Sequence, residues 1–369
     1  MTIQQIEIQL ITSVAALACS LIGVFLVLRK LAMASDAISH TVLLGIVLAF
    51  FVVRDLNSPL LILGATATGV LTFVIVELLI HTKLIKEDAA IGLVFPALFS
   101  IAIILISRYA TGVHLDIDSV LLGELAFAPF SRMIILGRDI GPKSLIIMGI
   151  ILTAILIFIA LFFKELKLTT FDAGLAATLG FMPGIIHYLL ITLVSVTAVG
   201  AFDAVGSILV IALMIGPAAT AYLLTNKLEI MLGLSAFFGV LSAVSGYWVA
   251  RVFDSSIAGS MATMVGVIFI ASLIFAPEQG LIAKFQREKS QKWRFAKQML
   301  IIHLLNHENA SDYLAESKIT HMYKEMNWTP EFTAHVINRA KQSNWIVQVD
   351  DRVDLTEQGR QIAHQTMER

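Results

Sequence analysis

The feature that most constrains this chain is a series of long apolar runs separated by short polar connections. A helix that crosses a bilayer needs about 20 mostly apolar residues, and nine segments approach this length. They are 8–28, 37–53, 59–80, 89–107, 144–163, 184–200, 206–225, 230–252 and 257–276. Because lipid offers no hydrogen-bond partners to an open backbone, such runs fold as helices. The sequence therefore predicts an all-α polytopic membrane protein with eight or nine transmembrane helices.

A further apolar segment, residues 116–129, is too short to cross a bilayer. We expect it to form a short re-entrant or interfacial helix that other helices cover. If it crossed instead, every span before it would change direction.

Charge density changes abruptly near Ala283. Residues 1–283 hold 13 Lys and Arg and 16 Asp and Glu, whereas the much shorter segment 284–369 holds 13 and 11. Only 14% of the whole chain is charged, against about 25% in a soluble domain. We therefore expect a transmembrane domain over 1–283 and a small soluble domain over 284–369. The single cysteine, Cys19, excludes an intramolecular disulfide.

The basic residues of the connections indicate how the chain is oriented. Cytoplasmic loops of membrane proteins carry an excess of Lys and Arg. With nine alternating spans, one side receives the tail from Lys284 together with Arg29, Lys30, Lys83, Lys86, Lys164, Lys167 and Lys227. The rule predicts an external N-terminus and a cytoplasmic C-terminal domain. A cluster of Arg132, Arg138 and Lys143 falls on the opposite side and is an exception.

The segment Ser35-Asp36-Ala37-Ile38-Ser39-His40 places ionisable groups at the start of the second run. Asp36 and His40 are four residues apart and therefore share one face of a helix. A carboxylate and an imidazole on one face suit a divalent transition metal, although two ligands do not complete its coordination shell. The alternative is a helix N-cap at Ser35 or Asp36, with His40 in a polar contact between helices.

Two other acidic residues are candidates for a transport pathway. Asp203 lies between two apolar runs, where it could line the outer mouth of a pathway or cap the following helix. Glu124 lies in the short apolar segment, where it could be buried or face lipid headgroups. Glu77 and His81 are also four apart, and a surface ion pair is the expected arrangement there.

A short helix is expected in the loop 168–181, on the cytoplasmic side. Thr170 or Asp172 can cap its start and Gly180 can close its end. Its small residues permit close docking to a partner, and an interfacial helix lying on the membrane is the alternative.

These motifs occur together with two others, Asp203-Ala-Val-Gly-Ser-Ile-Leu and Gly216-Pro-Ala-Ala-Thr-Ala. In their order and spacing, residues 8–280 resemble the membrane permease of metal-ion ABC importers, the manganese, zinc and iron group. One difference is Leu44, which stands where the family commonly has proline and predicts a straighter second span.

The resemblance implies a transport subunit with several partners. Asp36 and His40 would contact the metal, and Asp172, Ala176 and Gly180 would belong to a coupling helix that docks on an ABC ATPase. The chain has no P-loop motif, so ATP hydrolysis is expected on that separate chain and not on this one. Further expected partners are membrane lipid, an extracytoplasmic metal-binding protein, and a second permease chain, identical or paralogous. We expect a multi-pass protein of a bacterial inner or plasma membrane.

No permanently bound cofactor is expected, because the metal ion is the cargo. Manganese is favoured, since Asp and His ligands without thiolates suit it, while zinc and iron stay open.

The C-terminal segment resembles a winged-helix domain, with helices over 295–306, 311–326 and 330–342, a hairpin over 345–355, and a helix start at 355–363. Its near-neutral charge and membrane tether argue against nucleic acid as a partner, and favour a docking or regulatory role. Its histidines are His303, His307, His321, His335 and His364. They suggest a different function, a membrane-bound metal sensor, although the sequence shows little carboxylate or cysteine support beside them.

Overall fold

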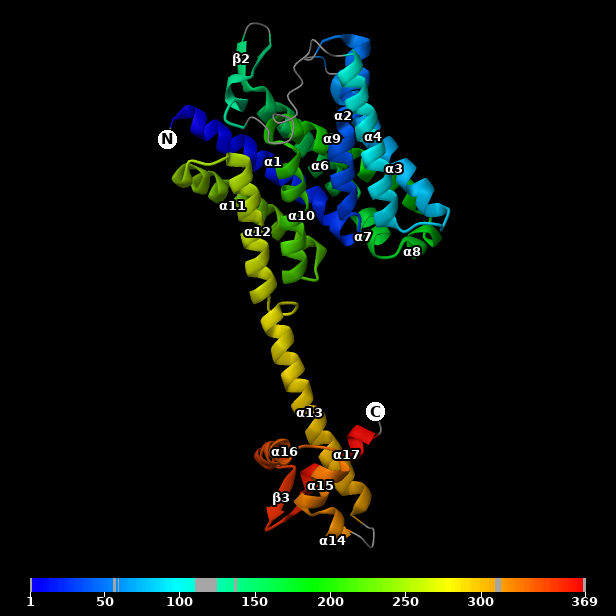
Figure 1. Cartoon of the computed structure of the whole chain (residues 1–369), viewed down its shortest axis with the longest axis vertical. Helices are drawn as coiled ribbons and strands as arrows, with labels where there is room; N and C mark the ends of the chain where they lie inside the picture. Colours follow the sequence, from blue (N-terminus) through cyan, green and yellow to red (C-terminus); the bar gives the residue numbers. More distant parts are fainter. Residues whose placement is uncertain are drawn as a thin grey trace. The chain divides into compact units, whose positions relative to one another are not determined.

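The computed structural model describes residues 2–55, 58, 60–109, 125–135, 138–308 and 313–367. The chain forms two compact units, Met1–Gly280 and Leu281–Arg369, each with a hydrophobic core of its own (Figure 1). The first unit contains the predicted spans, and the second contains most of the charged tail.

Each of the nine predicted runs is a helix long and apolar enough to cross a membrane. Within the described residues they are α1 (Ile3–Leu28), α2 (Ala32–Val53), α3 (Leu60–His81), α4 (Glu87–Tyr109), α6 (Lys143–Leu161), α9 (Pro183–Val205), α10 (Ser207–Leu224), α11 (Leu228–Phe253) and α12 (Ile257–Phe275). Two shorter helices, α7 (Phe163–Phe171) and α8 (Ala173–Thr178), lie between α6 and α9. The prediction of a polytopic helical protein is therefore confirmed.

Small residues bring the helix backbones of this unit close together. α1 is central and packs against α6, α9, α10 and α11. A Cβ built on Gly23 of α1 would lie 1.7 Å from the carbonyl oxygen of Met214 in α10, and one on Gly45 of α2 would lie 2.4 Å from that of Gly64 in α3. In lipid, no hydrophobic force drives helices together, because the lipid tails are as apolar as the helix surfaces. Helices therefore associate through such close packing of their backbones.

A β-hairpin, which the sequence did not predict, precedes α6. Its strands are β1 (Arg132–Ile135) and β2 (Arg138–Pro142), which pair antiparallel after the short 3₁₀ helix Ala128–Phe130. Arg132 forms ion pairs with Asp139 and, at 3.1 Å, with Glu7 of α1. Arg132, one of the basic residues that were the exception to the charge rule for cytoplasmic loops, is thus paired with acidic residues. Most of the predicted short helix at 116–129 lies outside the described residues.

The C-terminal unit consists of helices and one hairpin. Its elements are α13 (Leu281–His307), α14 (Tyr313–Glu316), α15 (Ile319–Glu325), α16 (Pro330–Gln342), β3 (Ile346–Val349), β4 (Arg352–Leu355) and α17 (Glu357–Met367). Leu300, Ile301, Val336 and Val353 are fully or almost fully buried in its core. The helices and hairpin follow the predicted order.

One predicted helix, 311–326, is interrupted in the structure. The backbone N–H of Val353 donates to Ser317 at 3.0 Å, and that of Ile319 donates to Asp351 at 3.0 Å. These bonds, with the bridge between Lys318 and Arg352, hold Lys318 extended beside the hairpin. The expected helix therefore becomes α14 and α15.

The contact of α2 with α3 yields a first prediction. Gly45→Ala should destabilise the protein by about 1–3 kcal/mol, because the added methyl overpacks a close backbone contact. Thermal unfolding of the purified chain in detergent would measure this. Gly92→Ala on α4 is the matched control, since a Cβ there has no neighbour within 4 Å. Equal midpoints for the two variants would contradict the packing described.

Candidate functional site

Asp36 and His40 lie on one face of α2, as their spacing predicted. The Asp36 Oδ1 atom is 3.4 Å from the His40 Nε2 atom, and the side chains are 35% and 27% exposed. The imidazole stacks on Phe95 of α4 with ring centroids 5.5 Å apart, and Phe99 lies edge-on at 6.0 Å. Aromatic rings thus fix the orientation of the imidazole and leave the carboxylate accessible.

The capping alternative for this segment is wrong. α2 begins at Ala32, its N-cap is Leu31, and no side chain caps it. Ser35 and Ser39 are buried, and their hydroxyls donate to the carbonyl oxygens of Ala32 and Ser35 at 2.9 and 2.8 Å. The serine hydroxyls therefore have their hydrogen bonds within α2. Asp36 and His40 remain as the side chains of this segment that are able to bind a ligand.

A polar seam behind the pair positions α2. The Thr72 hydroxyl of α3 lies 2.8 Å from that of Thr41 in α2, and both are buried. Next to it, a Cβ on Gly69 would lie 2.8 Å from the Ser195 hydroxyl of α9 and 3.1 Å from Ile38. α2, α3 and α9 thus meet at the level of the candidate site. The sequence analysis did not single out these glycine and threonine residues.

A third metal ligand is not found beside the pair. Among the described residues, every group of three or more clustered His, Cys, Asp or Glu ligands lies in the C-terminal unit. Asp203 lies near the end of α9, and the idea that it caps the next helix is wrong because Gly206 holds that position. Its side chain, like all of Glu124, lies outside the described residues.

Glu77 has a second partner besides His81. It lies 3.9 Å from His81, as expected, and it also accepts a hydrogen bond of 2.7 Å from the Tyr188 hydroxyl. The carboxylate therefore links α3 to α9.

The loop helix forms as α8 and is shorter than predicted. Asp172 caps its start, accepting from the backbone N–H of Leu175 at 2.8 Å. Ala176 is buried, and Gly180 lies beyond the helix end with φ +85°, a conformation that favours glycine. The three residues singled out from the sequence therefore shape this segment. Its exposed apolar surface consists of Phe171, Leu175, Leu179 and Met182.

Arg29 connects the candidate site with this loop. Its Nε and Nη2 atoms donate to the hydroxyls of Thr170 and Thr169 at 3.1 and 2.9 Å, and Nη1 is 3.4 Å from His187 Nδ1. The turn between α1 and α2 is thereby fastened to the end of α7, just before α8. The sequence analysis counted Arg29 only as a charge. Its position at the end of an apolar run, with Thr169-Thr170 in a loop on the same side, was the available signal.

The nine apolar helices found among the described residues define a multi-pass membrane protein. The family model "ABC 3 transport family" matches residues 4–276, and the chain belongs to this family. It is accordingly a membrane-spanning permease subunit and not an enzyme, with the ATPase on a separate subunit.

Individual relatives agree with this assignment. The chain is 42% identical over 357 residues to the zinc transport system membrane protein TroD of Treponema pallidum, covering 97% of each protein. It is 48% identical over 267 residues to the manganese transport system membrane protein MntD of Bacillus subtilis, covering 72% of this chain and 90% of that protein. A solved structure, PsaBC from Streptococcus pneumoniae in complex with Fab, superposes with a TM-score of 0.63 at 31% identity, covering 76% and 94%. The membrane-bound sensor is not supported.

The Arg29 contacts yield a second prediction. Arg29→Gln should release the segment 163–181, because hydrogen bonds to charged groups contribute about 1.5–3 kcal/mol each. Limited proteolysis of the purified chain should then cut this segment faster than in the wild type.

Lys30→Gln is the matched control, since Lys30 is the exposed neighbouring base. Unchanged cleavage in Arg29→Gln would show that Arg29 does not hold the loop.

Proposed function

We propose that this permease carries a divalent transition metal ion into the cytoplasm, with Asp36 and His40 as a binding station on the path. The observation that carries the proposal is the carboxylate–imidazole pair on α2, with 3.4 Å between its ligand atoms. The names of TroD and MntD, which refer to zinc and manganese transport, support this class of cargo. Manganese is our choice within it, because an oxygen and an imidazole ligand without thiolates suit that ion.

The pair supplies only two of the ligands that a metal ion needs. Mn²⁺ favours about six oxygen or nitrogen ligands, and the described part of the membrane unit adds no third His, Cys, Asp or Glu to the pair. A second permease chain, identical or paralogous, would supply another set across a shared path. Water molecules would complete the shell, and an extracytoplasmic metal-binding protein would deliver the ion.

The position of the pair suggests how transport is coupled to ATP hydrolysis. Asp36 and His40 lie in the first turns of α2, about 6–12 Å along the helix from its start at a rise of 1.5 Å per residue. That start follows Arg29, which is bonded to Thr169 and Thr170. A displacement of α8 by the ATPase would therefore act through Arg29 on the end of α2 that carries the ligands.

The exposed apolar surface of segment 171–182, which contains α8, is the proposed docking surface for the ATPase. Phe171, Leu179 and Met182 flank α8 and are 60%, 60% and 66% exposed, which is unusual for neighbouring large apolar side chains outside a bilayer. By the charge distribution this loop and the C-terminal unit would both face the cytoplasm, and the four spans α9 to α12 that separate them agree with this, because an even number of crossings returns the chain to the same side. The C-terminal unit, residues 284–369 by the sequence analysis, would then be a winged-helix-like module on the ATPase side.

The metal station yields a third prediction. Asp36→Asn with His40→Gln should reduce Mn²⁺ uptake at least about tenfold, because each change removes a metal ligand while keeping side-chain volume. Uptake would be measured in proteoliposomes with the ATPase and binding protein.

His81→Gln is the matched control, because His81 is also four residues after a carboxylate on an apolar helix but is 77% exposed at its end. ATPase binding should be unaffected in both. Wild-type uptake by the double variant would remove Asp36 and His40 from the path.

The docking surface yields a fourth prediction. Leu179→Glu should weaken binding of the ATPase, because burying the new charge in an apolar contact is costly. Co-purification with the ATPase measures the effect. Leu84→Glu is the control, an 86% exposed leucine in the turn between α3 and α4. Equal recovery of the ATPase with both variants would place the docking surface elsewhere.

A further inference from the structure

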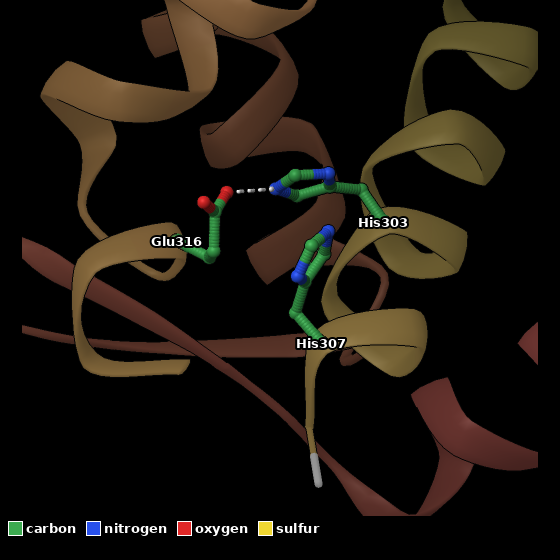
Figure 2. Close-up of side chains that lie close together, drawn as sticks. All are labelled: His303, His307 and Glu316. Atoms are coloured by element: carbon green, nitrogen blue, oxygen red, sulfur yellow. Dashed lines mark ion pairs between the residues drawn. The ribbon is translucent and has the colours of Figure 1, made fainter. Parts of the chain in front are cut away.

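A group of histidine and glutamate side chains converges in the C-terminal unit. His303 and His307 lie one turn apart at the end of α13, and Glu316 ends α14 (Figure 2). One ligand atom from each of the three lies within 4.8 Å of the others. The sequence analysis saw little carboxylate support for these histidines. The fold supplies it, because the break after Glu316 turns the end of α14 toward α13.

The distances within the group suit a small cation. The Nε2 atom of His303 is 3.6 Å from the Oε2 atom of Glu316, too long for a hydrogen bond. Two ligand atoms at the usual distance of about 2.0–2.1 Å from a tetrahedral Zn²⁺ lie about 3.3 Å apart. The rings of His303 and His307 have centroids 4.8 Å apart (Figure 2), so both imidazoles border the same space as the carboxylate.

The contact between His303 and Glu316 is buried, which distinguishes it from an ordinary surface ion pair. The side chains of His303 and Glu316 are 10% and 13% exposed, and His303 Nε2 is a buried atom without a hydrogen bond within the described residues. A buried nitrogen left without a partner is costly, and a bound cation would satisfy it.

Further side chains support the carboxylate from its other side. His321 Nδ1 of α15 is 2.9 Å from the same Glu316 oxygen and 3.2 Å from Glu325. Ligating carboxylates are normally held by such neighbours. His321 and Glu325 are 41% and 47% exposed, so this side of Glu316 is open to solvent and gives an ion a route in.

We propose that His303, His307 and Glu316 bind a divalent transition metal ion, with His321 orienting Glu316. Two imidazoles and one carboxylate form a ligand set that proteins use for Zn²⁺, with water in the fourth position. The ion would join α13 to α14 and so stabilise the C-terminal unit. This site shares no residue with the Asp36–His40 pair, and metal binding there does not depend on the proposed transport function.

Hydrogen–deuterium exchange on the purified full chain in detergent, first stripped with EDTA and then given Zn²⁺, tests the site. Backbone amides in 300–325 should exchange up to about a hundredfold more slowly at a Zn²⁺ concentration 100 times Kd, because binding to the folded state suppresses opening. Unchanged exchange in the wild type over this segment overturns the proposal. Mn²⁺ is run in parallel to rank the metals.

Variants separate this site from other metal sites on the chain. Glu316→Gln and His303→Gln/His307→Gln should lose the protection of 300–325, and their exchange without metal should match that of the wild type if they remain folded. His335→Gln/His364→Gln changes two histidines of the same unit that lie on α16 and α17, and it should keep full protection. Asp36→Asn/His40→Gln should also keep it. Protection that survives Glu316→Gln and His303→Gln/His307→Gln, or is lost in the His335/His364 control, would overturn the assignment.

Discussion

The absence of water inside a bilayer is the constraint on which the membrane unit depends. Hydroxyl groups on its helices mostly bond to a carbonyl oxygen one turn back, as Thr68 does to Gly64 and Thr220 to Gly216. This satisfies a polar group without a partner helix. Asp36 cannot be satisfied in that way, because an ionised carboxylate only accepts hydrogen bonds and cannot bond to a carbonyl oxygen. Against this background, ionisable side chains retained on α2 indicate a function that outweighs their cost.

Much of this organisation follows from the sequence, because long apolar runs of this kind fold as helices in lipid. The nine spans, the Asp36–His40 pair and the capping role of Asp172 were all predictable from composition and spacing. The hairpin at 132–142 was not, and one of its contacts, the ion pair of Arg132 with Glu7, joins residues far apart in the chain. The same holds for Glu316. Its approach to His303 depends on a helix break made by the hairpin of the C-terminal unit, and no local pattern records that.

The contacts of Arg29 join the start of α2, which carries Asp36 and His40, to the loop that contains α8. A rigid helix transmits displacement along its axis, whereas a flexible turn absorbs it. Arg29 lies in the turn before α2 and holds this turn to α7 through hydrogen bonds from its Nε and Nη2 atoms. The planar fork of arginine makes these bonds together, and lysine would make only one such contact in a fixed direction. Under the proposed function, movement at the loop would therefore reach the first turns of α2 through these bonds.

The shortness of α8 has a consequence for assembly. A helix of six residues does not form by itself in water, because nucleating the first turn is unfavourable. This one depends on the Asp172 cap and on the burial of Ala176 against the rest of the membrane unit. The surface that we assign to the ATPase therefore exists only after the spans have folded around it. Recruitment of the ATPase would then be reserved for correctly inserted permease, so that assembly of the complex also serves as a check on folding.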